Sequence, residues 1–306
     1  MGEMVAYVVL VASVCATFFA GPGAALFFLI RRKKRARSQR RSPIAKSLLR
    51  SPGHTLNEQL AQANEDVIFD LMVLMVVPLM TLALFFGQIY IRPGSNQLHL
   101  GVIYGIGAVG TVAFLLRKLV NTGTRLDHLK AGYDAEVAVG QELDQLMRRG
   151  AYVFHDVPGE NFNIDHVVVS ARGVFAVETK GYTKAVSDGN VSHVVEFDGR
   201  LLRFPTWSTS EPLEQSERQS RWLSQWLAKA TGDSVRVQAV LALPGWFVEL
   251  KGRGAVRVFN GAQLSGLLDS RGVAGLSLAE VTRVAHQIEQ RCRTVEPRYR
   301  DDEKAT

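Results

Sequence analysis

The chain has 306 residues, which is enough for two domains of ordinary size. Its composition is 47% hydrophobic and 21% charged, which excludes a wholly disordered chain. Two cysteines, Cys15 and Cys292, exclude a disulfide scaffold and a cysteine-rich metal site. The 36 basic and 29 acidic residues give a net charge of 36 − 29 = +7, so the position of the charges matters.

Much of the positive charge lies in one tract that directly follows an apolar run. The tract holds eight basic residues: Arg31, Arg32, Lys33, Lys34, Arg35, Arg37, Arg40 and Arg41. Without them the remaining chain sums to 7 − 8 = −1, so the high net charge does not by itself indicate nucleic-acid binding. A basic block beside an apolar run is typical of a membrane topology signal or of binding to anionic lipid, which we expect at Arg31–Arg41.

Three apolar runs in the first 120 residues predict three transmembrane helices, at about residues 4–30, 69–91 and 98–116. A basic loop, residues 31–68, separates the first two, and Thr55-Leu56-Asn57-Glu58 within it has the spacing of a helix-capping box. The alternative is that each run is a buried core helix. Three such runs so close together favour membrane spans.

Flanking charges predict how these spans are oriented. The leader Met1-Gly2-Glu3 has no positive charge, and the positive charges follow the first run, as in an uncleaved anchor rather than a signal peptide. The positive-inside rule places the basic loop and everything beyond Arg117 in the cytoplasm, with the N-terminus outside. We therefore expect a multi-pass protein of the cell membrane, with Asp70 at the cytoplasmic interface.

The second half of the chain has the composition of a water-soluble domain. Periodicity predicts helices at residues 134–149, 212–230 and 277–293. It predicts strands at residues 152–157, 164–170, 174–180, within 194–204, 235–243 and 256–259. This order predicts an α/β or α+β domain with a mixed sheet flanked by helices. The polar residues 295–306 are expected to form a disordered tail.

Charged residues at the ends of apolar strands are the candidates for chemistry. Asp165 lies in one predicted strand, and Glu178 and Lys180 end the next. Glu142 lies on the apolar stripe of the preceding helix. Converging carboxylates repel one another, and Mg²⁺ with its preference for oxygen ligands would relieve that repulsion. The alternative is a structural Glu–Lys pair at the surface.

The register of the two predicted strands decides whether Asp165 and Glu178 share a face. They share one if cross-strand partners sum to 343 or 345, and they lie on opposite faces if the partners sum to 344. A bulge at Gly173 favours 344, whereas a two-residue turn brings the carboxylates together. The sequence leaves both possibilities open.

Several short segments, taken in order, resemble the nuclease-related domain family, NERD, over about residues 131–248. They are Gly140-Gln141-Glu142, Asn163-Ile164-Asp165-His166-Val167-Val168-Val169, Gly173-Val174-Phe175, Glu178-Thr179-Lys180-Gly181 and Pro212-Leu213-Glu214-Gln215. The family is placed in the PD-(D/E)xK nuclease superfamily, so the resemblance implies a mixed sheet flanked by helices. Residues 249–294 would then be a C-terminal strand and helix that pack on this domain.

The resemblance also implies roles for individual residues. Asp165 and Glu178 would bind the metal, Lys180 would be the catalytic lysine, Glu142 the acidic residue of the first helix, and Gln215 a supporting residue. The chain departs from the family pattern at Gln219, where some relatives have Tyr, and at Asn163, where the superfamily name has Pro. The function that follows is Mg²⁺-dependent hydrolysis of DNA at the cytoplasmic face of the membrane. The alternative is an inactive nuclease fold that binds nucleic acid or protein partners there.

Overall fold

The computed structural model describes residues 21, 24–25, 27–32, 34–35, 42–91, 96–184, 186–187, 190–191, 193–269 and 275–297. The chain divides into two compact units. The helical unit comprises residues 1–45, 61–126 and 298–306. The sheet unit comprises residues 46–60 and 127–297. Each unit is described by itself.

The helical unit is built from long segments of α2 (His54–Ile91) and α3 (Gln97–Asp144). Within the described residues, these two helices are long and apolar enough to cross a membrane, by length and composition. The sequence predicts three such helices. The first prediction, residues 4–30, falls largely outside the described residues. Of the basic tract that follows, Arg31, Arg32, Lys34 and Arg35 are described, and they are helical and exposed.

Polar side chains join α2 to α3 inside the helical unit. The Tyr104 hydroxyl donates to Gln88 Oε1 at 2.7 Å. Lys118 Nζ lies 2.7 Å from Asp70 Oδ1, and Asp70 is only 2% exposed. Asp70 is therefore a buried, ion-paired residue between the two helices, and its expected place at the cytoplasmic interface stays a prediction. Many large apolar side chains of both helices remain exposed, among them Met75 and Ile106.

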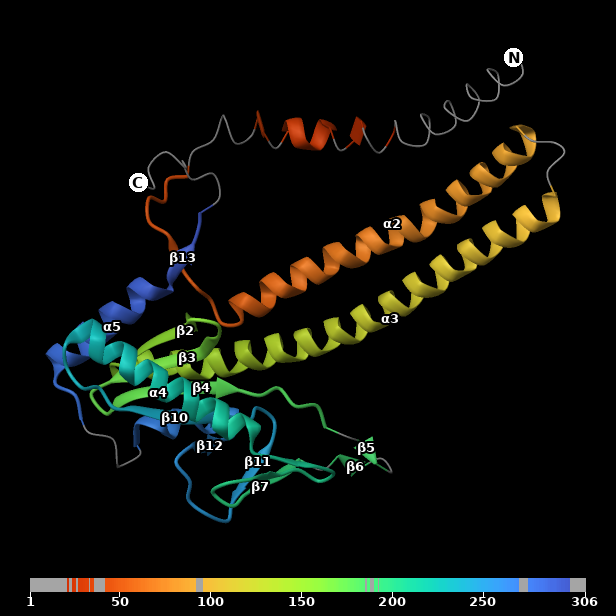
Figure 1. Ribbon diagram of the computed structural model, residues 1–306. Helices are drawn as coiled ribbons and strands as arrows, with labels where there is room; N and C mark the ends of the chain where they lie inside the picture. The colour runs from red at the N-terminus through yellow and green to blue at the C-terminus, as the bar shows by residue number, and fades with distance from the viewer. Residues whose placement is uncertain are drawn as a thin grey trace. The chain divides into compact units, whose positions relative to one another are not determined.

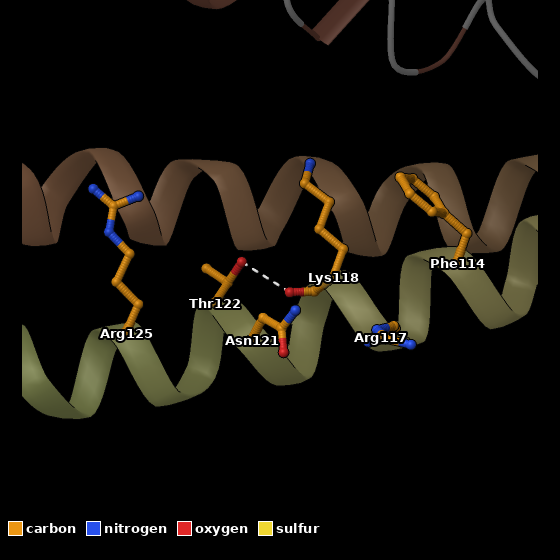
Figure 2. Close-up of a pocket in the computed structure, with 6 residues that line it drawn as sticks. All are labelled: Phe114, Arg117, Lys118, Asn121, Thr122 and Arg125. Atoms are coloured by element: carbon orange, nitrogen blue, oxygen red, sulfur yellow. Dashed lines mark hydrogen bonds between the residues drawn. The ribbon is translucent and has the colours of Figure 1, made fainter.

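A pocket of about 340 Å³ lies beside the Lys118 turn of α3 (Figure 2). Its lining consists of Phe114, Arg117, Lys118, Asn121, Thr122 and Arg125. Three of these six residues are cationic: Arg117 and Lys118 follow directly on the uncharged run that ends at Leu116, and Arg125 lies two turns further along. The apolar part of α3 thus ends in a concentrated positive charge.

A five-stranded mixed sheet forms the centre of the sheet unit, with strand order β12-β10-β4-β3-β2. The strands are β2 (Tyr152–Pro158), β3 (Asn163–Ser170), β4 (Gly173–Thr179), β10 (Val237–Ala242) and β12 (Arg257–Phe259). Strands β2, β3 and β4 are antiparallel neighbours, whereas β10 runs parallel to both β4 and β12. The mixed sheet expected from the sequence is confirmed.

Helices cover both faces of this sheet. On one face lie α4 (Glu211–Thr231) and α5 (Leu278–Cys292), whose Leu223 and Ile288 pack in the same apolar cluster as Val167 of β3 (Figure 1). On the other face, α3 and the 3₁₀ segment Gly261–Asp269 pack against Phe175. The capping box predicted for α5 is present: the Ser277 side chain accepts from the Glu280 amide.

A second, smaller sheet has the order β11-β7-β8-β9. Its strands are β7 (Val194–Phe197), β8 (Leu202–Arg203), β9 (Ser208–Thr209) and β11 (Phe247–Leu250). A separate two-stranded pair consists of β5 (Val186–Ser187) and β6 (Asn190–Val191). The sequence predicts strands around Asp198 but does not predict β11, whose pairing with β7 joins distant parts of the chain.

The segment that precedes α2 belongs to the sheet unit. Strand β1 (Leu48–Leu49) pairs with β13 (Arg293–Val295), which follows α5. The sequence assigns residues 46–60 to a loop of the membrane half, but they lie in the same compact unit as residues 127–297. Residue 295, expected to open the disordered tail, is the last residue of β13. These long-range contacts leave no local signal in either segment.

The register of β3 and β4 settles the question left open by the sequence. His166 pairs with Val177 and Ser170 pairs with Gly173, so the partners sum to 343. Only Ala171 and Arg172 form the turn. This two-residue connection places Asp165 and Glu178 opposite each other on the same face of the sheet.

Candidate active site

Glu178 lies at the end of β4 and is surrounded by hydrogen-bond donors. Its side chain is 3% exposed. Lys180 Nζ and Gln215 Nε2 each lie 2.7 Å from Oε1, and Gln219 Nε2 lies 2.6 Å from Oε2. Gln215 and Gln219 occupy successive turns of α4, so one helix face supplies both amides. The cluster brings together three residues expected from the sequence, Glu178, Lys180 and Gln215, and adds Gln219.

Asp165, opposite Glu178 on β3, has a different environment. Its Oδ2 accepts a hydrogen bond from the Thr179 amide at 2.7 Å. Burial raises the pKa of Asp165 well above its ordinary value, and the charges of Glu178 and Glu136 raise it further. The backbone hydrogen bond and Lys180 act in the opposite direction but do not cancel this effect. Ionisation of Asp165 therefore costs free energy in the folded protein.

Glu136 is the carboxylate that α3 contributes to this site, near Asp165. Burial raises its pKa to about 7, with further contributions from the charges of Asp156 and Glu178. Glu142, which the sequence marks for this position, lies elsewhere: its carboxylate accepts from Gln145 Nε2 at the exposed surface. A sequence signal for Glu136 did exist. Glu136 lies three residues before Val139 and seven before Leu143, which are both fully buried, so it belongs to the same stripe of the helix.

Lys180 completes the cluster from the residue after β4. Its backbone amide donates to the Ala242 carbonyl at 3.0 Å, which fixes the chain beside β10. Its ammonium group also donates to Gln215 Oε1 at 3.0 Å. Burial acts to lower the pKa of Lys180, but the charge and hydrogen bond of Glu178 outweigh it, so the pKa is raised. Lys180 is therefore a fixed positive charge at neutral pH.

Asp156 of β2 is a third strand carboxylate, which sequence reasoning did not single out. On either side of it, His155 pairs with His166 and Val157 with Ile164, so Asp156 lies opposite Asp165 in register. Its φ of 49° is in the left-handed region, which costs a non-glycine residue about 1 kcal/mol or more. The surrounding contacts must hold this conformation in place.

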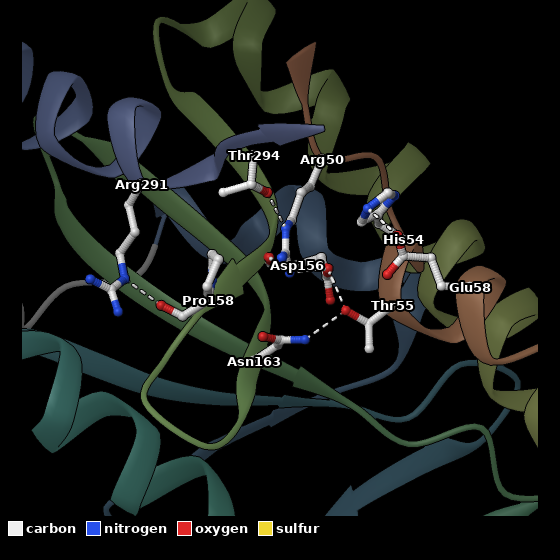
Figure 3. A network of polar contacts seen from close by, with 9 residues as sticks. All are labelled: Arg50, His54, Thr55, Glu58, Asp156, Pro158, Asn163, Arg291 and Thr294. Atoms are coloured by element: carbon white, nitrogen blue, oxygen red, sulfur yellow. Dashed lines mark hydrogen bonds and ion pairs between the residues drawn. The ribbon is translucent and has the colours of Figure 1, made fainter. Parts of the chain in front are cut away.

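Those contacts come from Arg50, which precedes α2, and from Thr55 in the first turn of α2 (Figure 3). Arg50 Nη1 lies 2.8 Å and the Thr55 hydroxyl 2.7 Å from Asp156 Oδ2. Thr55 in turn accepts from Asn163 Nδ2 at 2.7 Å, and Arg50 Nε donates to Thr294 Oγ1 at 2.8 Å. The sequence marks Thr55 as a helix cap. The helix does begin there, at His54, but the hydroxyl serves the sheet instead.

A pocket of about 540 Å³ opens beside these carboxylates. Its lining comes from the start of α2, from α3, and from β2, β3 and the loop between them: Thr55, Leu56, Gln59, Glu136, Asp156, Pro158, Gly159, Glu160, Asn161, Phe162, Asn163 and Asp165. The Arg291 guanidinium stabilises this loop, because it donates to the carbonyls of Pro158 and Gly159. The pocket is thus a formed cavity with four acidic residues in its wall.

On the opposite face of β3, His166 belongs to a different polar group. It is fully buried, and its Nδ1 lies 2.9 Å from His155 Nδ1, whose Nε2 lies 3.0 Å from Asp144. Burial lowers the pKa of both histidines, so the pair is neutral near pH 7. Strand alternation predicts that His166 points away from Asp165, and it lies against α3 at Gly140. The pair is part of the core beneath α3.

The residues at the site suit a Mg²⁺ ion bound by few protein ligands. The available side-chain donors are carboxylate oxygens, which Mg²⁺ prefers, and burial makes the charge of Asp165 and Glu136 costly without a cation. Within the part of the chain that the structure describes, no group of three or more His, Cys, Asp or Glu side chains is arranged to hold a metal ion.

A mixed sheet flanked by helices, with an Asp and a Glu-x-Lys pair brought together on neighbouring strands, fits a nuclease-like domain. Residues 131–244 match the family model of NERD, the nuclease-related domain. This part of the chain is therefore similar to the nuclease-related domain, as the sequence motifs predict. No curated protein and no solved structure matches the chain.

Proposed function

We propose that this protein is a membrane-anchored, Mg²⁺-dependent nuclease that hydrolyses DNA phosphodiester bonds at the cytoplasmic face of the cell membrane. The observation that carries the proposal is the pairing of Asp165 with Glu178 across β3 and β4, with Lys180 and Gln215 in contact with Glu178. Asp165 also lines a pocket of about 540 Å³, together with Glu136 and Asp156. The proposal assigns each of these residues a role in catalysis.

Asp165 and Glu178 would hold the metal, and Glu136 would take the role of helix carboxylate that the sequence gives to Glu142. A bound Mg²⁺ would supply Lewis-acid polarisation of a phosphate oxygen. Gln215 and Gln219 keep the Glu178 carboxylate in one orientation. Lys180 supplies a fixed positive charge for the phosphate as negative charge builds on it.

Hydrolysis requires a water oxygen to form a bond to phosphorus while one phosphorus–oxygen bond to the sugar breaks. One proton of the water ends on the leaving oxygen. Lys180 can orient the water or stabilise the extra charge, and its raised pKa suits the second task, because it stays charged throughout.

The membrane part of the proposal rests on α2 and α3. Both are apolar enough to span a bilayer, and large apolar side chains along them are exposed rather than packed. Arg117, Lys118 and Arg125 follow the apolar run of α3, which favours a cytoplasmic location for that end of the helix. With the basic tract at Arg31–Arg41, which would bind anionic lipid, this supports an outside N-terminus and a cytoplasmic nuclease-related domain.

A second candidate is an inactive nuclease fold that binds partners at the membrane. One observation favours it: both Glu178 oxygens already have protein donors, so the carboxylate serves a structural role whether or not a metal binds. The near-neutral charge outside the basic tract points the same way, because duplex binding depends on positive surface charge.

The test is cleavage of linear, nicked and single-stranded DNA by the full chain in detergent, with and without Mg²⁺. Asp165→Asn should reduce cleavage to background. Lys180→Met should reduce it about 10²–10³-fold, as expected for the loss of one preorganised charge at the reacting group. Glu136→Gln should impair cleavage, whereas the matched control on the same helix, Glu142→Gln, should not. Undiminished cleavage by Asp165→Asn would refute the metal-site assignment.

A negative result for the wild-type chain is also informative. If it cleaves neither DNA nor RNA, and Mg²⁺ does not shift its melting temperature, the binding module becomes the better description. Orientation is tested separately, by labelling single cysteines from outside the cell in a Cys15→Ser, Cys292→Ser background. Asn96→Cys should react and Glu160→Cys should not.

A further inference from the structure

The loop between β8 and β9 presents an exposed tryptophan close to the candidate active site. Trp207 is 41% exposed, whereas Trp246 in the same cluster is 2% exposed. The Trp207 ring stacks on Phe204, with centroids 4.2 Å apart and planes inclined by 10°. A backbone hydrogen bond of 2.8 Å from the Phe204 amide to the Trp207 carbonyl closes the loop beneath the two rings.

Other aromatic rings hold this stack in place. Tyr182 meets Phe204 and Trp207 edge-on, at centroid distances of 5.3 and 4.9 Å. Trp246 packs edge-on against Phe204 at 4.9 Å, and its indole N–H donates to the Tyr182 carbonyl at 3.1 Å. Lys184 lies over the Trp246 ring at 5.8 Å. The exposed ring is therefore rigidly supported, unlike an isolated surface aromatic.

Two chain connections tie this cluster to the Glu178 site. Tyr182 follows Lys180 by two residues, and its ring is close enough to respond to the charges there: burial raises its pKa, Lys180 opposes this, and Glu178 adds to it. On the other side, β9 leads directly into α4, whose Gln215 contacts Glu178. Trp207 thus stands eight residues before a side chain of the site.

We propose that Trp207 and Tyr182 form a stacking surface for the bases of single-stranded nucleic acid, placing an unpaired strand beside Asp165 and Glu178. This inference rests on the proposed nuclease function and specifies its substrate class. Bases inside a duplex are already stacked and cannot present a face to Trp207, whereas an unpaired base can.

Charge also favours a single strand over a duplex. Outside the basic tract the chain sums to −1, which gives little general attraction for the dense charge of a duplex. Stacking on an aromatic ring supplies affinity that does not depend on a large positive surface, and each stacked base contributes substantially. Lys184, which lies over the Trp246 ring, provides positive charge within the aromatic cluster.

The test is fluorescence anisotropy of the full chain in detergent with a labelled 12-nucleotide oligothymidine and a blunt duplex of the same length. EDTA is present, so that binding is measured without cleavage. Trp207→Ala should weaken single-strand binding about tenfold or more. Trp207→Phe should retain most of the affinity, because it keeps an aromatic ring. Tyr152→Ala, which removes a 45% exposed aromatic from the start of β2, is the control and should bind like wild type.

A further variant covers the case in which Trp207→Ala fails to fold. Trp207→Leu keeps apolar bulk without a stacking ring and should also lose single-strand affinity. Wild-type affinity in either variant, or equal losses on single strand and duplex, would overturn the proposal. So would binding of a proline-rich peptide at Trp207 without any binding of the oligonucleotide.

The outcome separates this inference from the nuclease proposal. If cleavage depends on Asp165 but single-strand binding does not depend on Trp207, the stacking proposal is wrong and the nuclease proposal stands. Trp207-dependent binding in a chain that cleaves nothing would leave the stacking surface and favour the binding module.

Discussion

Two carboxylates that face each other across one strand pair have opposite environments. Glu178 receives hydrogen bonds or charge from Lys180, Gln215 and Gln219. Asp165 receives a backbone amide and lies near the charges of Glu178 and Glu136. Asp156 resembles Glu178, because Arg50 and Thr55 supply its donors. Glu136 resembles Asp165, because burial and like charges raise its pKa.

The contrast shows that carboxylates of one site can have opposite effects on the stability of the fold. A carboxylate with enough hydrogen-bond donors stabilises the fold, and its removal leaves those donors without an acceptor. A carboxylate without enough donors destabilises the fold at neutral pH, and only a proton or a cation relieves it. On sequence alone, Asp165 and Glu178 are expected to behave alike, so variants of each residue test this distinction.

The largest effect is expected at Glu178. Glu178→Ala removes a buried carboxylate and leaves the half-buried Lys180 and Gln215 and the buried Gln219 without their acceptor, which should lower the free energy of unfolding by about 3–5 kcal/mol. Asp165→Asn removes repulsion, so without Mg²⁺ its stability should equal or exceed that of wild type. Tryptophan fluorescence during urea unfolding is a suitable measurement, since all four tryptophans lie in residues 127–297. Equal losses in the two variants would contradict the contrast.

The second effect concerns Arg50, the ion-pair partner of Asp156. Arg50→Ala should lower the free energy of unfolding of the sheet unit by about 2–3 kcal/mol, because it leaves a buried carboxylate with a single side-chain donor. The same fluorescence measurement applies. The matched control is Arg221→Ala, which breaks an exposed pair with Glu217 and should cost under about 1 kcal/mol.

The third effect is a pH dependence at Glu136. Its pKa is about 7 in the folded chain, above the ordinary value of 4.5, so its ionised form costs stability above pH 7 and nothing below pH 4.5. As the pH falls from 8 to 5, this group therefore adds stability, on the order of 1–2 kcal/mol. Glu136→Gln should lose that gain, seen as a smaller stability difference between the two pH values than in wild type. Glu142→Gln should keep the wild-type difference.

The smallest effect is expected at Thr55. Thr55→Val keeps the shape of the side chain but removes the hydroxyl that joins Asp156 to Asn163, which should cost about 1 kcal/mol in urea unfolding. Arg50 still neutralises Asp156 in this variant. A loss as large as that of Arg50→Ala would mean that the hydroxyl, rather than the ion pair, holds the strained turn at Asp156.

Local patterns predicted the parts of this molecule that depend on local physics. The central strands, α4, and the capping box of α5 follow from periodicity and from Ser277 and Glu280. Asp165, Glu178, Lys180 and Gln215 lie together as the motif order suggests. Of the acidic residues of α3, Glu136 rather than Glu142 lies near Asp165, and the apolar stripe that includes both residues could not distinguish them.

The contacts that the sequence could not supply are those between distant segments. Nothing near Arg50 indicates that it pairs with Asp156, about a hundred residues later. The β1–β13 ladder is two residues long on one side, too short for a periodic signal. The shared face of Asp165 and Glu178 depended on one residue more or less in a turn, which alternation alone could not decide.

The pairing of β1 with β13 has a consequence for how the chain is assembled. Because Leu48 pairs with Val295, the helices of residues 61–126 form an insertion within the sheet unit, tethered to it at both ends. During synthesis, β1 is made almost 250 residues before its partner β13, so the sheet unit closes only after residue 295 has been made. A single protease cut near residue 127 would not free the C-terminal part, because residues 46–60 would still hold it.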